Sequence, residues 1–215
     1  MTANLTLLYA SKKEDIRNRL EDYKKVWYED DKRIFSELAF CLCTPQTKAS
    51  AGDLAVKRMV ADNSLFTGKA EQLRPHLTKA GVRFSNNKSK YIVEAREFFS
   101  RNDEMNVKSK LNTSDIVGLR NWLADNVKGL GMKEASHFLR NIGFGKDLAI
   151  LDRHILRNMV KYEIIPETPK TISKKTYLEM EEVLRKFAKS SSIGMDEIDL
   201  LFWSEYGSLP ISEMK

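Results

Sequence analysis

Cysteine is scarce in this chain, and its scarcity limits the covalent and metal chemistry that the protein can perform. The 215 residues include two cysteines, Cys41 and Cys43. Two thiols cannot ligate a four-cysteine iron–sulfur cluster within one chain. Because residues i and i+2 of a helix point to different faces, the pair favours neither a shared metal ion nor a local disulfide. We expect both thiols to be reduced and buried, as in cytosolic proteins.

Long apolar runs, strand patterns and internal repeats are also lacking. No run approaches the length of a membrane span, and residues 5–10 are too short, and lack the basic lead-in, to be a signal peptide. We therefore expect a cytoplasmic protein without a membrane partner. No alternation of apolar and polar residues persists over a useful length, so the fold should be mainly helical.

The size and charge of the chain set broad limits on its organisation and partners. A chain of 215 residues can bury a sizeable core, as one domain or as two small lobes that share a cleft. The net charge of +6 and the pI of about 9.2 suit a polyanionic partner without requiring one. Helical periodicity predicts helices over residues 1–34, 34–43, 48–60, 65–77, 90–100, 114–127, 133–141, 152–162 and 176–189, with a last helix from about residue 195.

Two of these helices, 114–127 and 133–141, are joined by a short turn that contains Gly129 and Gly131. Thr113 or Ser114 is the expected N-cap of the first helix, and the two glycines indicate a turn too tight for side chains. Their backbone N–H groups can approach a ligand closely, and the second helix points its positive N-terminus the same way. This arrangement favours an anion such as DNA phosphate, although glycine is also common at ordinary helix ends.

One lysine and one aspartate add possible chemistry to the hairpin. Lys133 lies in the first turn of the second helix, where the helix dipole favours a neutral, nucleophilic amine that can attack a sugar C1′ and form a Schiff base. A solvated surface lysine is the simpler interpretation. Asp152 follows an apolar run at an expected helix start, where it can serve as an N-cap and also face a developing cation.

The two motifs together carry a family resemblance. Residues 129–135, Gly-Leu-Gly-Met-Lys-Glu-Ala, followed by residues 151–154, Leu-Asp-Arg-His, resemble the helix-hairpin-helix, Gly/Pro-rich loop and Asp signature of the DNA glycosylase superfamily. Lysine at this position marks the bifunctional members, which remove a base and then nick the strand. From Phe35 to Lys215 the chain is similar to the short second class of 8-oxoguanine DNA glycosylase/AP lyase. Residues 40–46 and 82–88, together with the terminal lysine, carry the likeness to that class.

The resemblance implies an all-α, two-lobed helix-hairpin-helix glycosylase fold with a cleft between the lobes. Residues 1–44 plus 141–215 would form one lobe, and residues 45–140 the central lobe that ends in the hairpin. Lys133 would form the Schiff base, and Asp152 would stabilise positive charge on the sugar. The implied partner is double-stranded DNA that contains 8-oxoguanine, bound by a monomer. The family suggests a monovalent cation on the hairpin carbonyls, but no side-chain cluster in the sequence predicts a metal ion, and we expect no cofactor.

Further residues are candidates for DNA contact. In the superfamily, a polar residue that matches Gln46 fills the hole left by the flipped-out base; an ordinary helix-entry glutamine is the alternative. The loop over residues 81–88 holds Arg83, Phe84 and Lys88, which suit phosphate contact and base stacking, although a solvated loop with one buried Phe fits equally well. His154 either bonds a flanking phosphate or is a helix-surface histidine.

Base selectivity is assigned to two residues near the C-terminus. The oxidised base has an N7–H donor where guanine has a lone pair, so a fixed acceptor facing N7 can distinguish them. In the resembled class this role belongs to the C-terminal lysine, here Lys215, and Trp203 corresponds to the residue that stacks on the flipped base. A core tryptophan is the alternative for Trp203. A glycosylase/lyase for oxidised pyrimidines and a non-catalytic helix-hairpin-helix DNA-binding module are the competing functions.

Overall fold

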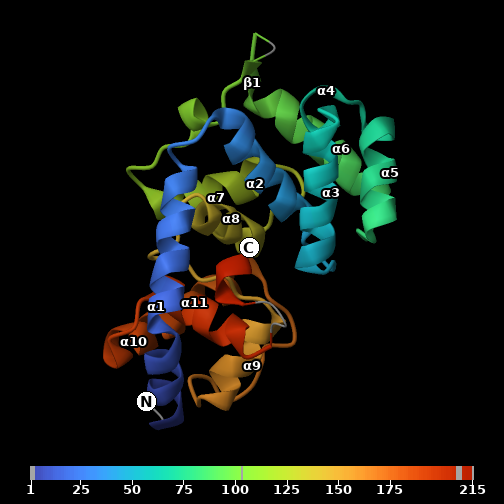
Figure 1. The fold of residues 1–215 in the computed structure, drawn as a ribbon. Helices are drawn as coiled ribbons and strands as arrows, with labels where there is room; N and C mark the ends of the chain where they lie inside the picture. The colour runs from blue at the N-terminus through green and yellow to red at the C-terminus, as the bar shows by residue number, and fades with distance from the viewer. Residues whose placement is uncertain (1–2, 103, 207–209, 215) are drawn as a thin grey trace. The chain divides into compact units, whose positions relative to one another are not determined.

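The structure, a computed structural model, describes residues 3–102, 104–206 and 210–214 (Figure 1). These residues form eleven α-helices, one two-stranded antiparallel ribbon and two 3-10 turns, so the expected all-α class is confirmed. No helix among them is long and apolar enough to cross a membrane. The elements are α1 Ala3–Val26, α2 Asp31–Cys43, α3 Ala49–Ala61, α4 Ser64–Thr67, α5 Ala70–Ala80, α6 Ser85–Phe99, β1 Ser100–Arg101, β2 Glu104–Met105, η1 Lys108–Lys110, α7 Ile116–Asn126, α8 Met132–Asn141, α9 Arg153–Lys161, α10 Lys174–Ser191, α11 Met195–Ser204 and η2 Ile211–Glu213.

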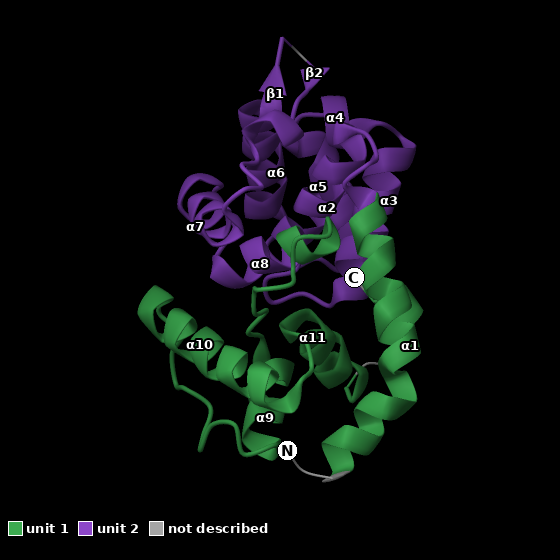
Figure 2. Cartoon of the chain, turned by 90° about the vertical axis from the view of Figure 1, so that its left-hand side faces the viewer, with its two compact units in different colours: residues 1–25, 139–215 green, residues 26–138 purple. Residues whose placement is uncertain are grey.

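The described chain divides into two compact units (Figure 2). Unit 1 holds residues 1–25 and 139–215, and unit 2 holds residues 26–138. The sequence-based division into lobes placed residues 26–44 with the chain ends instead. In the structure α2 packs against α3 and α6, which explains why this segment groups with the central part of the chain. The division into functional lobes stays a prediction, because the compact units describe packing alone.

Helix α2 is the centre of unit 2. Asp30 caps it by accepting a 2.8 Å hydrogen bond from the backbone N–H of Arg33, and so the predicted helix over residues 1–34 is interrupted between Val26 and Asp31. Every residue of α2 from Ile34 to Cys43 is buried, including both cysteines, as expected. Burial raises the pKa of the Cys43 thiol to about 12. The helix ends one residue before Thr44, and Pro45 follows, as the sequence predicts.

Helix α6 begins earlier than predicted. The sequence suggested a loop over residues 81–88, but α6 starts at Ser85, so Lys88 lies in its first turn instead of in a loop. Phe84, in a left-handed conformation with φ of 58°, is the N-cap. The run Ser85-Asn86-Asn87 lacks apolar periodicity, which is why the periodic pattern did not include it. The predicted helix over residues 65–77 also differs, since the structure forms α4 and α5 in that region.

In unit 1 the C-terminal part of α1 lies against Met214, near the other end of the chain. Tyr23 of α1 donates its hydroxyl to the carbonyl of Met214 at 2.7 Å, and the Nε of Arg19 donates to the same oxygen at 2.7 Å. Helix α11 packs against α9 and α10. The side-chain amide of Asn158 in α9 donates a 2.8 Å hydrogen bond to the carbonyl of Phe202 in α11, which fixes these two helices against each other.

Candidate functional site

The hairpin between α7 and α8 forms as expected, but its two glycines differ in role. Gly129 has φ of +93°, and a Cβ atom there would lie 2.6 Å from the Tyr91 ring. Only glycine fits this position without rearrangement. The nearest atom to a Cβ at Gly131 would be a Glu134 carboxylate oxygen at 3.1 Å, which can move, so the expected tightness applies to Gly129 more than to Gly131.

The start of α7 also differs from the expected cap. Asp115 is the N-cap, and its carboxylate accepts a 2.8 Å hydrogen bond from the backbone N–H of Gly118. The sequence pattern predicts the cap at Thr113 or Ser114, one or two residues earlier. The difference leaves the turn itself unchanged, because α7 still ends at Asn126 and α8 begins at Met132.

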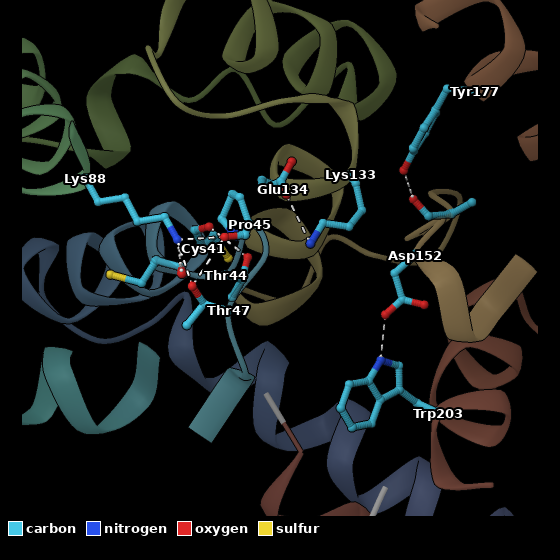
Figure 3. A network of polar contacts seen from close by, with 12 residues as sticks. Cys41, Thr44, Pro45, Thr47, Lys88, Lys133, Glu134, Asp152, Tyr177 and Trp203 are labelled. Carbon is cyan, nitrogen blue, oxygen red and sulfur yellow. Dashed lines mark hydrogen bonds and ion pairs between the residues drawn. The ribbon is translucent and has the colours of Figure 1, made fainter. Parts of the chain in front are cut away.

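Lys133 is the second residue of α8, in the first turn as predicted. Its side chain is 24% exposed, and its Nζ lies 3.1 Å from Oε1 of Glu134, whose side chain is 13% exposed (Figure 3). The sequence pattern does not predict this ion pair, because adjacent residues on a helix do not normally face each other. The nucleophilic form of Lys133 therefore has to arise next to a carboxylate oxygen.

Asp152 is the N-cap of α9, and it uses its two carboxylate oxygens differently. Oδ1 accepts hydrogen bonds from the backbone N–H groups of His154 at 2.8 Å and Ile155 at 2.9 Å. Oδ2 accepts a 3.0 Å hydrogen bond from Nε1 of Trp203 in α11 (Figure 3). The predicted cap is confirmed. The contact with Trp203 joins residues 51 positions apart and could not be predicted from the sequence.

His154 and Trp203 belong to one aromatic cluster of unit 1. The His154 imidazole lies 5.6 Å from the Trp203 ring and 5.1 Å from the Tyr206 ring, measured between ring centroids. Its Nδ1 is buried without a hydrogen-bond partner among the described residues. Trp203 is half-buried, so it is neither a fully enclosed core residue nor a free surface ring.

A buried ion pair anchors the helix that carries Trp203. Arg140 donates to Oδ2 of Asp199 at 2.8 Å, and the side chains are 6% and 5% exposed. Burial raises the pKa of Asp199 to about 6, against the lowering effect of Arg140, and the negative charge of Asp152 adds to the rise. Asp199 and Trp203 are four residues apart on α11 and share one face. The pair therefore supports the position from which Trp203 reaches Asp152.

Four exposed residues of unit 2 adopt left-handed backbone conformations, and two of them, Gln46 and Phe84, are candidate DNA contacts. Gln46, between α2 and α3, has φ of 54°, and Phe84, before α6, has φ of 58°. Gln46 is exposed and Phe84 is 52% exposed, with the Arg83 guanidinium 5.4 Å from the centre of its ring. The alternative of a buried Phe84 is therefore wrong. Such conformations cost a non-glycine residue about 1–3 kcal/mol and are concentrated at functional sites.

Lys88 was expected to contact DNA from an exposed loop, and the structure corrects its placement. Its side chain is 4% exposed, and Nζ donates to the carbonyls of Cys43 and Pro45, both at 2.7 Å, and to Oγ1 of Thr47 at 3.0 Å (Figure 3). Burial lowers the pKa of Lys88 to about 8. All three donors of the ammonium bind protein oxygens, which leaves none for a phosphate.

The remaining predicted site residue, Lys215, lies outside the described residues, so its role stays a prediction. Thr47 and Glu134 contact site residues, and the sequence analysis did not select them. Among residues 3–102, 104–206 and 210–214, no three His, Cys, Asp or Glu side chains gather closely enough to hold a metal ion.

Sequence comparison connects the chain to proteins of known activity. A family model described as 8-oxoguanine DNA glycosylase matches residues 16–193. A Fusobacterium nucleatum protein named 8-oxoguanine DNA glycosylase/AP lyase is 46% identical over 198 residues, which cover 91% of this chain and 90% of that protein. A protein of the same name from Methanocaldococcus jannaschii is 36% identical over 191 residues, 89% of this chain and 88% of that protein.

Solved structures give the same result for the fold. The crystal structure of the M. jannaschii 8-oxoguanine glycosylase/lyase in complex with a 15mer DNA containing 8-oxoguanine superposes with a TM-score of 0.86 and 32% identity, covering 97% of this chain and 99% of that chain. The 8-oxoguanine DNA glycosylase of Thermotoga maritima superposes with a TM-score of 0.83 and 34% identity, covering 96% of each chain.

Proposed function

Since the chain belongs to the helix-hairpin-helix family of 8-oxoguanine DNA glycosylases, we propose that Lys133 and Asp152 carry out the family's reaction in this protein. The protein is a bifunctional DNA repair enzyme that excises 8-oxoguanine and then cleaves the abasic strand. The observation that supports the residue assignment best is the local structure of the signature. Lys133 lies at the start of α8 beside the glycine turn, and Asp152 lies at the start of α9.

Lys133 is the proposed nucleophile. Its Nζ, as the free amine, attacks C1′ of the damaged nucleotide, and the N-glycosidic bond electrons leave with the base, which takes up a proton. Opening of the sugar ring gives an imine between Nζ and C1′. Loss of a C2′ proton then breaks the C3′–O bond by β-elimination, which nicks the strand. The Glu134 carboxylate, 3.1 Å from Nζ, is a base within reach of the proton that Lys133 has to lose.

Asp152 is the proposed electrostatic partner of the sugar. Departure of the base develops positive charge on the sugar ring, which an ionised carboxylate stabilises. Two backbone N–H groups and the Trp203 indole hold this carboxylate in one orientation before substrate arrives. Preorganisation of this kind avoids a reorientation cost during the reaction.

The DNA contacts follow from exposure and backbone geometry. A base must leave the duplex before its glycosidic bond can be reached, and we assign Gln46 to the space that it vacates. Phe84 is exposed and can stack on a neighbouring base, while Arg83 beside it can bind phosphate. The backbone at Gly129 and Gly131 is assigned to phosphate binding at the start of α8.

Three further assignments concern α9, α11 and the C-terminal residue. Trp203 keeps its proposed role of stacking on the flipped base, in addition to its contact with Asp152. Lys215 keeps its proposed role of reading the N7 position of that base. His154 is the candidate for a flanking phosphate. We also propose that the enzyme works as a monomer on the nucleoid in the cytoplasm, where its DNA substrate lies.

Covalent trapping tests the central assignment. Borohydride reduces the imine between a lysine and an abasic sugar to a stable adduct, so the wild-type protein should become covalently attached to DNA that contains 8-oxoguanine. Lys133→Gln should abolish the adduct. Lys128→Gln is the matched control, because Lys128 is a 64% exposed cation in the same hairpin, and it should retain trapping.

Two outcomes would contradict the proposal. Retained trapping in Lys133→Gln would move the nucleophile to another amine. Equal cleavage of duplexes with 8-oxoguanine and with an oxidised pyrimidine would contradict the substrate assignment while leaving the lysine chemistry intact.

A further inference from the structure

The ammonium of Lys88 cross-links a surface loop from inside unit 2. Its three partners are the carbonyls of Cys43 and Pro45 and the hydroxyl of Thr47. The Pro45 carbonyl belongs to the peptide group that precedes Gln46, and Thr47 directly follows Gln46. Lys88 therefore bonds the backbone before Gln46 and the side chain of the residue after it, and Gln46 itself has a left-handed conformation. A cation with short bonds to three oxygens fixes this loop more firmly than neutral hydrogen bonds would.

The same lysine connects the exposed residue Gln46, the tip of this loop, to a second exposed tip at Phe84. Lys88 lies one turn after Phe84, the left-handed N-cap of α6. The backbone N–H of Arg83, next to Phe84, donates a 3.1 Å hydrogen bond to Oγ1 of Thr47, the atom that also accepts from Lys88. The Thr47 hydroxyl in turn donates to the Pro45 carbonyl at 3.3 Å. The two tips are thus joined by one continuous set of bonds through Thr47.

The hydrogen bonds of Lys88 and Thr47 hold an unfavourable backbone conformation at Gln46 and Phe84. A left-handed conformation is unfavourable at a glutamine and more so at a phenylalanine, and it persists only where the surroundings enforce it. Without the ammonium, the peptide before Gln46 is free to rotate toward a relaxed conformation, and the amide side chain would change direction. The buried Cys43 carbonyl would also lose the hydrogen bond that Lys88 donates to it.

We infer that Lys88 is a positioning residue that locks the Gln46 and Phe84 tips in the conformation that enters the DNA duplex when the damaged base is flipped out. Its effect on excision opposite cytosine acts through Gln46, and it makes no contact with DNA itself. The inference rests on the proposed function in one respect, the role of Gln46 in filling the vacated space.

Substrates that differ in the base opposite 8-oxoguanine distinguish a positioning role of Lys88 from a general loss of protein stability. When 8-oxoguanine opposite cytosine is flipped out of the duplex, the cytosine is left unpaired and Gln46 can form hydrogen bonds with it. When 8-oxoguanine lies opposite an abasic analogue, no opposite base is present for Gln46 to bond. Lys88→Met retains the length of the side chain and removes its charge. We expect it to slow single-turnover excision opposite cytosine by about tenfold, and opposite the abasic analogue by less than about twofold. Lys90→Met, an exposed lysine on the same helix, should leave both rates unchanged.

A double-mutant cycle asks whether Lys88 acts through Gln46. Gln46→Ala should slow excision opposite cytosine, and adding Lys88→Met to it should cost less than about a further twofold, because residues that act as a unit are not additive. Fully additive losses, or equal losses on both substrates, would overturn the inference alone. A Gln46→Ala variant with the wild-type rate opposite cytosine would overturn the proposed role of Gln46 and the inference with it.

A second variant keeps the test decisive if Lys88→Met does not fold, which circular dichroism would reveal. Thr47→Val retains the size of the side chain and removes the shared hydroxyl. It should reproduce the loss opposite cytosine at a smaller size, about threefold, with the abasic-analogue rate preserved. Equal rates for Thr47→Val and wild type on both substrates would then overturn the inference.

Discussion

Trp203→Phe tests whether the tryptophan serves the reaction through its ring face, through its N–H group, or through both. Phenylalanine retains an aromatic face for the flipped base and deletes the donor that bonds Oδ2 of Asp152 at 3.0 Å. If stacking on the base were the only role, Trp203→Phe would behave nearly as wild type. If orientation of Asp152 matters as well, the variant should lose activity although its aromatic face remains.

The size of the expected loss follows from the bonds to Asp152. The two backbone bonds of 2.8 and 2.9 Å involve Oδ1 and remain in the variant, so α9 keeps its cap. The indole bond is the one described contact of Oδ2. A hydrogen bond to a charged group contributes about 1.5–3 kcal/mol, and because Asp152 is half-buried, water recovers part of it. We take the lower end, about 1.5 kcal/mol, which corresponds to a loss of about tenfold in the excision rate.

Single-turnover excision of 8-oxoguanine, with enzyme in excess, measures this loss without interference from product release. Trp203→Ala should be slower than Trp203→Phe, because it also removes the stacking face. Asp152→Asn supplies the background for a double-mutant cycle, in which Trp203→Phe should cost less than in the wild-type protein. A wild-type rate in Trp203→Phe, or the same factor in both backgrounds, would refute the orienting role of the indole.

Two further predictions concern pH and the hairpin. Because burial lowers the pKa of Lys88 to about 8, raising the pH from 7 to 9.5 deprotonates its amine and leaves two N–H donors for three oxygens. The rate of excision opposite cytosine, divided by the rate opposite the abasic analogue, should therefore fall as the pH rises. This pH dependence should be absent in Lys88→Met. The charged or titratable side chains that influence Lys88 are Cys43, Glu134, Lys133 and Arg83. Gly129→Ala should lower the free energy of unfolding by about 2 kcal/mol or more, from the left-handed backbone and the clash with Tyr91. Gly131→Ala should lower it by less than about 1 kcal/mol, because the Glu134 carboxylate can move away. Urea unfolding without DNA measures both, and equal losses would contradict the steric argument.

The parts of the site that depend on neighbouring residues could be predicted from the sequence. The glycine turn, the place of Lys133 in the first turn of α8 and the cap formed by Asp152 each depend on residues within a few positions of one another. Helix signals of this kind are local, because caps and turns use backbone groups close in the chain. The family resemblance added the chemistry to these positions, and the comparisons confirm the family.

Contacts between distant residues could not be predicted in the same way. Lys88 binds oxygens that lie 41 to 45 positions away in the chain, and no periodic pattern encodes such a contact. Its sequence setting, a polar run of Ser, Asn and Lys, suggested an exposed loop, and the helix that begins at Ser85 was missed for the same reason. The bond from Trp203 to Asp152 likewise requires two helices to pack before it exists.

The two carboxylate oxygens of Asp152 make different contacts, so a substitution there can remove the negative charge and still leave the helix cap intact. Oδ1 accepts both capping bonds at the start of α9, whereas Oδ2 binds the Trp203 indole and takes no part in the cap. An asparagine there could still start the helix through its carbonyl oxygen while lacking the negative charge. On the proposed mechanism, Asp152→Asn thus gives a folded protein that still binds 8-oxoguanine DNA and does not excise the base.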